Sequence, residues 1–134
     1  MFENSLYKII NLDFGTEQFN KISAKIELNE HHDIFKGHFP GNPVMPGVCF
    51  VQIIKDILSK CIGENIVLKS ASNIKFLEIV NPVLNKNLDI EITLKNFRSK
   101  IESSININSI ITNNEKTVFK MSAEFIVENE IELN

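Results

Sequence analysis

The feature that most constrains the fold is a single helical pattern of apolar side chains. In the other periodic segments of the chain, apolar and polar side chains alternate. From Phe50 to Cys61 the apolar side chains recur at intervals of three and four residues, which is typical of one face of an α-helix. The helix is predicted to begin near Pro46 or Gly47 and to end at about Cys61, because Gly63 follows as a stop signal. Most of this helix should be covered by other parts of the chain.

The remaining segments indicate strands. Residues 22–28 and 88–94 alternate apolar and polar side chains cleanly, as half-buried strands do. Residues 6–12 fit either an opening strand or a helical turn. Further strands are predicted at 66–68 and 73–80, interrupted at 70–72, then at 105–111 and 118–127, with a hairpin turn at 113–116.

One long helix and several antiparallel strands define the fold class. A single helix has to bury its apolar face against a sheet, so we expect an α+β fold in which the sheet wraps around the helix. The 134 residues suit a single domain over residues 1–134. Such a sheet leaves an edge strand, and pairing in a homodimer is a common way to cover one.

Composition excludes several classes of function. The net charge of −3, with dispersed basic residues, argues against nucleic acid as a partner. No apolar run approaches the roughly 20 residues that span a bilayer, and residues 1–13 lack a signal-peptide pattern. We therefore expect a cytoplasmic protein without membrane insertion. Cys49 and Cys61 lie too far apart on one helix to form a disulfide, and Cys49 is expected to be a small buried residue rather than an activated thiol.

A stiff loop precedes the helix. Residues 37–48 read Gly-His-Phe-Pro-Gly-Asn-Pro-Val-Met-Pro-Gly-Val and hold three of the four prolines and three of the five glycines around His38. Proline fixes φ and glycine opens conformations that other residues avoid. A rigid loop that presents a histidine at the start of a helix is a plausible place for chemistry. No metal-ligand spacing is present, so neither a metal nor another cofactor is expected.

This motif resembles that of the hot-dog-fold beta-hydroxyacyl-acyl-carrier-protein dehydratases of type II fatty acid synthesis. A weaker similarity continues through residues 73–77 and 81–83, and the strand pattern extends it over nearly the whole chain. The resemblance implies a hot-dog fold, an antiparallel sheet wrapped around one long central helix. It also implies a dimer with two active sites at its interface.

The resemblance assigns roles to residues of the motif. His38 corresponds to the base that removes a proton from the carbon next to the thioester, and its ordinary pKa near 6.5 suits that task. The N–H groups of Gly47 and Val48 correspond to those that polarise the thioester carbonyl, as expected at the positive end of a helix. Phe39 is expected to contact the substrate. Phe76, with Phe50, is a candidate for lining an acyl tunnel or simply for the core.

Gln52 departs from the family pattern. The family places an acidic residue fourteen positions after the histidine, on the helix of the other subunit, and here that position is Gln52. An amide hydrogen-bonds a hydroxyl but does not supply a proton as a carboxylic acid does. Gln52 is therefore either an amide that orients substrate or water, or simply part of a solvent-facing stripe. The polar stripe of the helix consists of Gln52, Lys55, Asp56, Ser59 and Lys60.

Three functions follow from the resemblance. The first is a hydro-lyase that removes water from a 3-hydroxyacyl thioester on acyl carrier protein to give a 2-enoyl thioester. The second is a non-catalytic subunit that binds the acyl thioester or carrier protein, alongside an acid-bearing paralogue. The third is an acyl thioesterase on the same scaffold. In each case the expected partners are acyl carrier protein and further copies of the chain, in a homodimer or a higher homo-oligomer.

Overall fold

The computed structural model describes residues 2–15, 20–37, 41–95 and 104–128. They form one long α-helix, a short 3₁₀ helix at Asp33–Phe35 and a six-stranded sheet. The long helix is α1 (Gly47–Ile62). The strands are β1 (Tyr7–Phe14), β2 (Lys21–Leu28), β3 (Ile66–Phe76), β4 (Asn87–Leu94), β5 (Ser104–Asn113) and β6 (Lys116–Val127).

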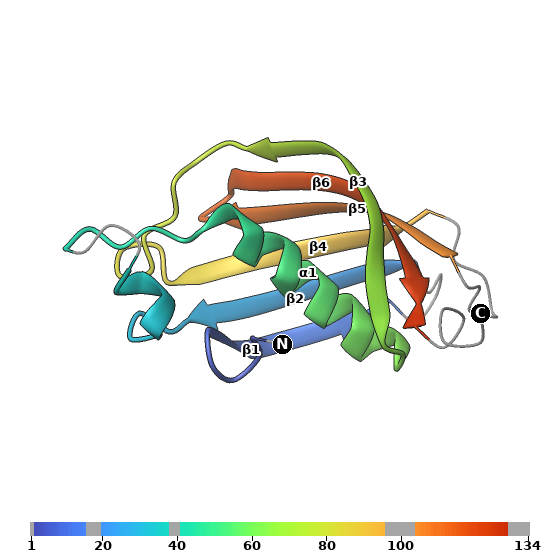
Figure 1. The fold of residues 1–134 in the computed structure, drawn as a ribbon, viewed down its shortest axis with the longest axis horizontal. Coiled ribbons are helices and arrows are strands. Elements are labelled where there is room, and N and C mark those ends of the chain that lie inside the picture. Colours follow the sequence, from blue (N-terminus) through green and yellow to red (C-terminus); the bar gives the residue numbers. More distant parts are fainter. Residues whose placement is uncertain (1, 16–19, 38–40, 96–103, 129–134) are drawn as a thin grey trace.

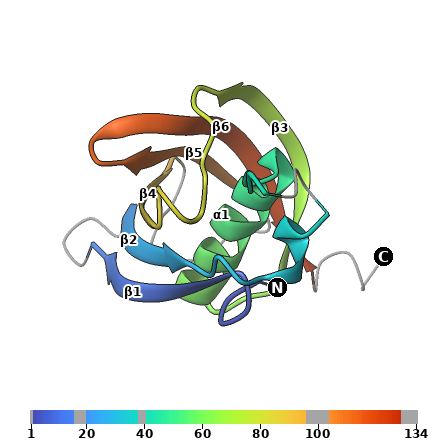
Figure 2. The same ribbon diagram turned by 90° about the vertical axis from the view of Figure 1, so that its left-hand side faces the viewer.

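The sheet curves around α1. Its strand order is β1-β2-β4-β5-β6-β3, and every pair of neighbours is antiparallel. Figure 1 shows α1 lying across the strands, and Figure 2, seen end-on, shows the sheet curling around the helix from β1 to β3. The predicted α+β architecture, with a sheet wrapped around one long helix in the hot-dog fold, is confirmed.

Helix α1 is the centre of the core. Phe50, Ile53, Ile54, Ile57 and Leu58 are buried against the inner sides of the strands. The helix ends where Gly63 adopts a left-handed conformation (φ 72°) and donates its N–H to the Ser59 carbonyl oxygen. A residue without a Cβ is favoured there, so Gly63 is the stop that the sequence predicted.

The polar stripe of α1 does not face solvent throughout. Lys60 is exposed and Gln52 is half-buried, but Asp56 is only 4% exposed. The expectation of a continuous solvent-facing stripe was therefore wrong at Asp56. The physical reason is that the N-terminal segment, residues 2–7, covers this side of the helix and supplies donors to the carboxylate.

Most strand predictions are confirmed, with one correction. Residues 6–12 belong mainly to strand β1, and Asn114 and Glu115, both with positive φ, form the turn between β5 and β6. Residues 66–76, however, form one strand rather than two. The register against β6 shifts after Leu68 and again after Ser72, so irregular pairing absorbs the residues that interrupt the alternation. The strand also ends at Phe76 instead of residue 80.

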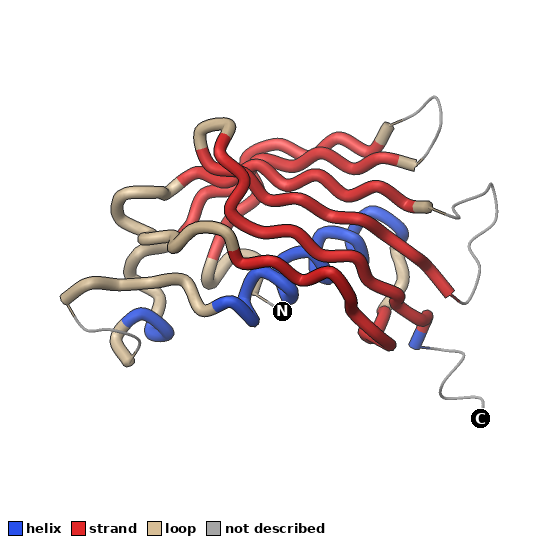
Figure 3. Tube along the Cα trace, turned by 90° about the horizontal axis from the view of Figure 1, so that it is seen from above, coloured by secondary structure: helices blue, strands red, loops and turns tan. Residues whose placement is uncertain are grey.

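Several connections gather at one end of the molecule. The segment that leads into α1 and the connection between β3 and β4 lie at the same end in Figures 1 and 3. The Met45 N–H donates to the Val80 carbonyl oxygen at 2.8 Å, which ties the two segments together. The start of α1 is thus held in a defined position beside the end of β3. No helix among the described residues has the length and hydropathy needed to cross a membrane.

Candidate functional site

The start of α1 offers unpaired backbone donors. Pro46 is the N-cap residue, and its side chain makes no hydrogen bond to the first turn. The first N–H groups of a helix have no partner within it, and the positive end of the helix dipole lies there. Val48 is 73% exposed, so this turn faces outward. Gly47 and Val48 are therefore placed where their N–H groups can bind an anionic or polarised oxygen.

An aromatic ring closes over the first turn of α1. A Cβ atom on Gly47 would lie 2.4 Å from Cε1 of Phe76, so this glycine allows the ring to approach the backbone. The ring of Phe76 packs on Phe119, which in turn stacks on Phe50, with 5.2 Å between centroids in each pair. Phe76 is nevertheless 59% exposed. It is the member of this aromatic group that offers a face to a ligand, whereas Phe50 belongs to the core.

His38 and Phe39 lie outside the described residues. Their predicted roles as base and substrate contact are therefore untested by the structure. The described parts of the loop lead up to Gly37 and resume at Gly41, which has a φ of 82°. That value lies in the left-handed region that glycine adopts easily.

Gln52 lies one helical turn beyond Val48, and its amide is engaged by Asp56. Gln52 Nε2 donates to Asp56 Oδ1 at 2.7 Å across the i, i+4 spacing. Gln52 is half-buried, so its amide is partly exposed and is also bonded to its neighbour on the polar stripe. Both readings of Gln52 stay open. Gly47, Val48 and Gln52 all lie on the first turns of α1. The predicted site takes Gln52 from the helix of a second subunit, so its pairing with Gly47 and Val48 stays a prediction.

Asp56 is anchored from the other side by the N-terminal segment. Its Oδ2 atom accepts the Phe2 N–H at 2.9 Å and the Tyr7 hydroxyl at 3.2 Å. Burial of the phenol, together with the adjacent Asp56 carboxylate, raises the pKa of Tyr7 far above its usual range. An ion pair between Lys60 and Glu3, 3.2 Å long, holds the same segment on α1 one turn further on.

Neither cysteine of α1 is an activated thiol, since Cys49 is buried and Cys61 is half-buried. Both are free, and desolvation raises the pKa of Cys49 and raises that of Cys61 to about 11. An activated thiol needs a lowered pKa. The expectation that Cys49 is a small buried residue is confirmed. Among the described residues, no group of His, Cys, Asp and Glu side chains is suited to hold a metal ion.

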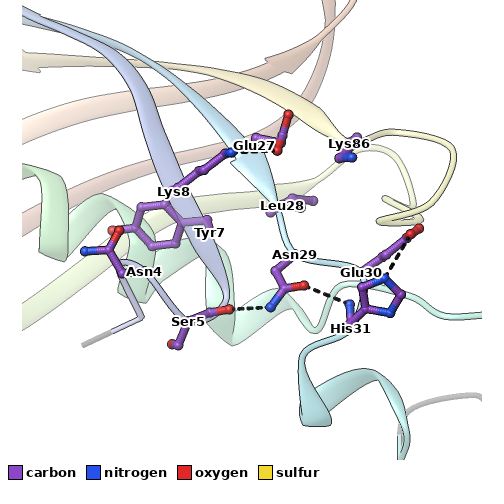
Figure 4. Close-up of a pocket in the computed structure, with 10 residues that line it drawn as sticks. All are labelled: Asn4, Ser5, Tyr7, Lys8, Glu27, Leu28, Asn29, Glu30, His31 and Lys86. Atoms are coloured by element: carbon purple, nitrogen blue, oxygen red, sulfur yellow. Dashed lines mark hydrogen bonds and ion pairs between the residues drawn. The ribbon is translucent and has the colours of Figure 1, made fainter.

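A separate pocket lies beside the N-terminal segment and shares Tyr7 with the contact set of Asp56. It has a volume of about 350 Å³ and is formed at the end of the β1–β2 ribbon, with Lys8, Asn29 and Lys86 among its lining residues (Figure 4). None of the predicted site residues lines it. Its polar groups already bond one another, for instance Asn29 Nδ2 to the Ser5 carbonyl oxygen at 2.9 Å. We assign it no part in the candidate site.

The contact set around Asp56 is the part of the site that sequence reasoning missed. The only signal in the sequence was the i, i+4 spacing of Gln52 and Asp56 on one helix. Tyr7 and Phe2 come from the N-terminal segment, far from α1 in the sequence, and for residues 6–12 the choice between a strand and a helical turn was open. Nothing in their pattern indicated that they lie over the helix.

The fold is a hot-dog fold, and comparison with known proteins identifies the family. The chain belongs to the ApeI-like family, described as ApeI dehydratase, whose model matches residues 15–120. It is 32% identical over 103 residues to the 3-hydroxyacyl-[acyl-carrier-protein] dehydratase FabZ of Lactococcus lactis, an alignment that covers 71% of this chain and 67% of the relative.

Other relatives match over a shorter part. The FabZ of Ligilactobacillus salivarius is 32% identical over 88 residues, which is 60% of this chain and 61% of that protein. The chain therefore spans less than two thirds of that relative. Among solved structures, the dehydratase heterocomplex ApeI:P from Xenorhabdus doucetiae matches with a TM-score of 0.67 at 16% identity, covering 88% of this chain and 96% of that one.

A hypothetical thioesterase protein from Streptococcus pneumoniae has the same fold, with a TM-score of 0.59 at 19% identity, over 94% of this chain and 92% of the other. The fold alone does not separate dehydration from thioester hydrolysis.

Proposed function

We propose that this protein is a 3-hydroxyacyl-[acyl-carrier-protein] dehydratase, which removes water from a 3-hydroxyacyl thioester to give a 2-enoyl thioester. The observation that carries the proposal is the match to the dehydratase family across residues 15–120, which includes the whole motif at residues 37–48. The exposed N–H groups at the start of α1 support it, because they suit the thioester oxygen of the enolate that forms.

The proposed reaction begins with removal of a proton. His38 takes the proton from the carbon next to the thioester, and the electrons of the C–H bond pass toward the carbonyl oxygen. The N–H groups of Gly47 and Val48 stabilise the resulting negative charge. The electrons then form the double bond between the α and β carbons as the bond from the β carbon to the hydroxyl oxygen breaks.

The departing hydroxyl needs a proton to leave as water. Gln52 is an amide and supplies none, so the imidazolium of His38 is the proposed donor. The proton taken from the α carbon then returns on the leaving water, and no net proton is consumed. The proposed role of Gln52, supplied by the second subunit of the proposed dimer, is to hold the hydroxyl in position for this transfer.

We propose acyl carrier protein as the partner that delivers the substrate, and a homodimer as the working unit. Strand β3 is an edge of the sheet and pairs with β6 on one side, while Leu68, Ile74 and Phe76 along it are exposed. An exposed edge with apolar side chains favours pairing with a second chain. A dimer through β3 would place the two helix starts near the shared interface.

A second candidate function rests on Gln52. With an amide where the family has an acid, the chain would serve as a binding subunit beside an acid-bearing paralogue, without turnover of its own. A solved structure with the same fold is named as the dehydratase heterocomplex ApeI:P, which supports a function beside a second protein. Tight binding of acylated carrier protein without a change in its mass would favour this reading.

The test is a mass measurement on the carrier protein. The purified chain is incubated with a 3-hydroxyacyl carrier protein, and loss of one water from the thioester is followed over time. We expect turnover in the native protein, and a decrease of roughly 10²–10⁴-fold in kcat for His38→Ala. His31→Ala, at an exposed histidine, serves as the matched control with native activity.

The opposing results are distinct. Release of free carrier-protein thiol would indicate a thioesterase, and an unchanged mass would contradict catalysis by the chain alone. If activity appears only after a paralogue is added, the subunit reading replaces the enzyme reading.

A further inference from the structure

Asp56 is a buried charged side chain that the proposed reaction has not used. It lies in the middle of α1 with 4% of its surface exposed. Three donors converge on it, from Phe2, Tyr7 and Gln52. An ionised carboxylate only accepts hydrogen bonds, and a buried charge is tolerated when donors surround it. The question is what this arrangement does for the site.

The carboxylate fixes which end of the Gln52 amide faces outward. A glutamine amide has a donating Nε2 and an accepting Oε1, and either can point toward a given neighbour. Because the Asp56 carboxylate has nothing to donate, it selects Nε2, at 2.7 Å from Oδ1. Oε1 is then turned away from Asp56, and no described residue donates a hydrogen bond to it.

The N-terminal segment keeps the carboxylate from turning. The Phe2 N–H and the Tyr7 hydroxyl both donate to Oδ2, at 2.9 and 3.2 Å, which leaves Oδ1 for Gln52. The Phe2 N–H is a main-chain donor and cannot reverse its role. The donor and acceptor roles are therefore fixed throughout this set of contacts. The N-terminal segment donates to Oδ2 of Asp56, and Gln52 Nε2 donates to Oδ1.

We propose that Asp56 is a positioning residue, which holds the Gln52 amide so that Oε1 accepts a hydrogen bond from the β-hydroxyl of the substrate. The proposal rests on the proposed dehydratase function. With the hydroxyl hydrogen directed at Oε1, the lone pairs of the hydroxyl oxygen are left to accept the proton that makes it a leaving group. Asp56 itself does not touch the substrate.

Asp56→Asn tests this with almost no change in shape. The Asn oxygen would remain with the Phe2 and Tyr7 donors, so its Nδ2 would face Gln52. Gln52 would then turn to offer Oε1 inward and Nε2 outward. We expect kcat to fall about tenfold, as for the loss of one hydrogen bond in the transition state, at an equal fraction of folded protein.

A second substitution separates orientation from simple damage. In the Asp56→Asn background, Gln52→Glu provides an outward carboxyl group and an inward acceptor for the Asn amide, so we expect kcat to recover. In the native background, Gln52→Glu places two carboxylates side by side, and we expect lower stability and lower kcat than in the double variant. Ser109→Ala is the control, since it removes a buried hydrogen bond from strand β5 to the Met121 carbonyl oxygen and does not involve the Asp56 contacts. It should lower stability without changing kcat.

The proposal is overturned if Asp56→Asn keeps native kcat, or if Gln52→Glu is equally active in both backgrounds. If the native protein shows no turnover, nuclear magnetic resonance of the Gln52 side-chain amide still tests the positioning role of Asp56. One Nε2 hydrogen should exchange slowly with water in the native protein and rapidly in Asp56→Asn. Rapid exchange of both hydrogens in the native protein would contradict the positioning role, whereas slow exchange without turnover would contradict only the dehydratase function.

Discussion

Gly47 shows how one missing Cβ sets up the candidate site. Its backbone carries an N–H of the first helical turn, and the ring of Phe76 occupies the space that any other side chain would need. The sequence motif predicted a glycine at the helix start as a donor. The contact with Phe76 was not predictable, because the two residues are brought together by the end of β3 rather than by local spacing.

We expect Gly47→Ala to change the free energy of unfolding by no more than about 1–2 kcal/mol and to weaken thioester binding strongly. The new methyl group pushes the half-exposed Phe76 ring outward, across the turn that binds the carbonyl oxygen. The measurement is urea unfolding together with the affinity for acylated carrier protein. In the Phe76→Ala background the same substitution should have no effect on stability, and an equal effect in both backgrounds would contradict the contact.

Tyr7 gives a direct optical probe, because it is the one tyrosine in the sequence. Burial beside Asp56 raises its pKa far above the value near 10 of an unfolded chain. The folded state therefore holds this proton where the unfolded state releases it, so stability is full below pH 10 and falls as pH rises further.

The phenolate absorbance near 295 nm should accordingly appear only as the protein unfolds in alkali. Circular dichroism, followed in the same titration, measures the fraction of folded protein at each pH. In concentrated guanidinium chloride the absorbance should rise near pH 10. An absorbance that rises at that pH while the protein stays folded would contradict the burial of Tyr7.

At the scale of elements, α1 was the most predictable part of the chain. Its period, its glycine stop and its apolar face are all local properties, and the structure reproduces them from Gly47 to Ile62. Strand β3 was less predictable because its bulges are defined only against β6. The burial of Asp56 could not be predicted for a similar reason. A helical period shows which side chains share a stripe, but not which segment covers that stripe.

The thiols of α1 test how firmly this helix is held. Cys61 has a pKa of about 11, so at pH 8 only about 0.1% of it is thiolate. Cys49 is fully buried. We expect Cys61 to react with a thiol reagent far more slowly than free cysteine, and Cys49 to react only at the rate of unfolding. Cys61→Ser isolates the second rate, and fast labelling of that variant would show that α1 opens locally.

At the scale of the whole molecule, the two edges of the sheet differ. The β3 edge exposes Leu68, Ile74 and Phe76, whereas β1 at the opposite edge exposes Ile10 as its large apolar residue. The sequence predicted that an edge would be left, but not which strand would form it, because that depends on the order in which strands far apart in the chain pair.

We expect Ile74→Lys to shift the protein toward monomer, because a charged side chain on the β3 edge opposes pairing with a second chain. Ile10→Lys, at the β1 edge, is the matched control and should leave the mass in solution unchanged. Sedimentation at several concentrations measures both. A monomeric native protein, or a mass that responds to Ile10→Lys instead, would contradict a dimer through β3.

The hydrogen bond between Gln52 and Asp56 also restricts how such a chain can change over time. A helix that needed a carboxyl group at position 52 would have to alter both members of the pair. If Gln52→Glu comes first, two adjacent carboxylates result, and they repel each other. If Asp56→Asn comes first, two amides result, and they still form a hydrogen bond with each other. Substitution at position 56 before position 52 therefore passes through a stable intermediate, whereas the reverse order does not.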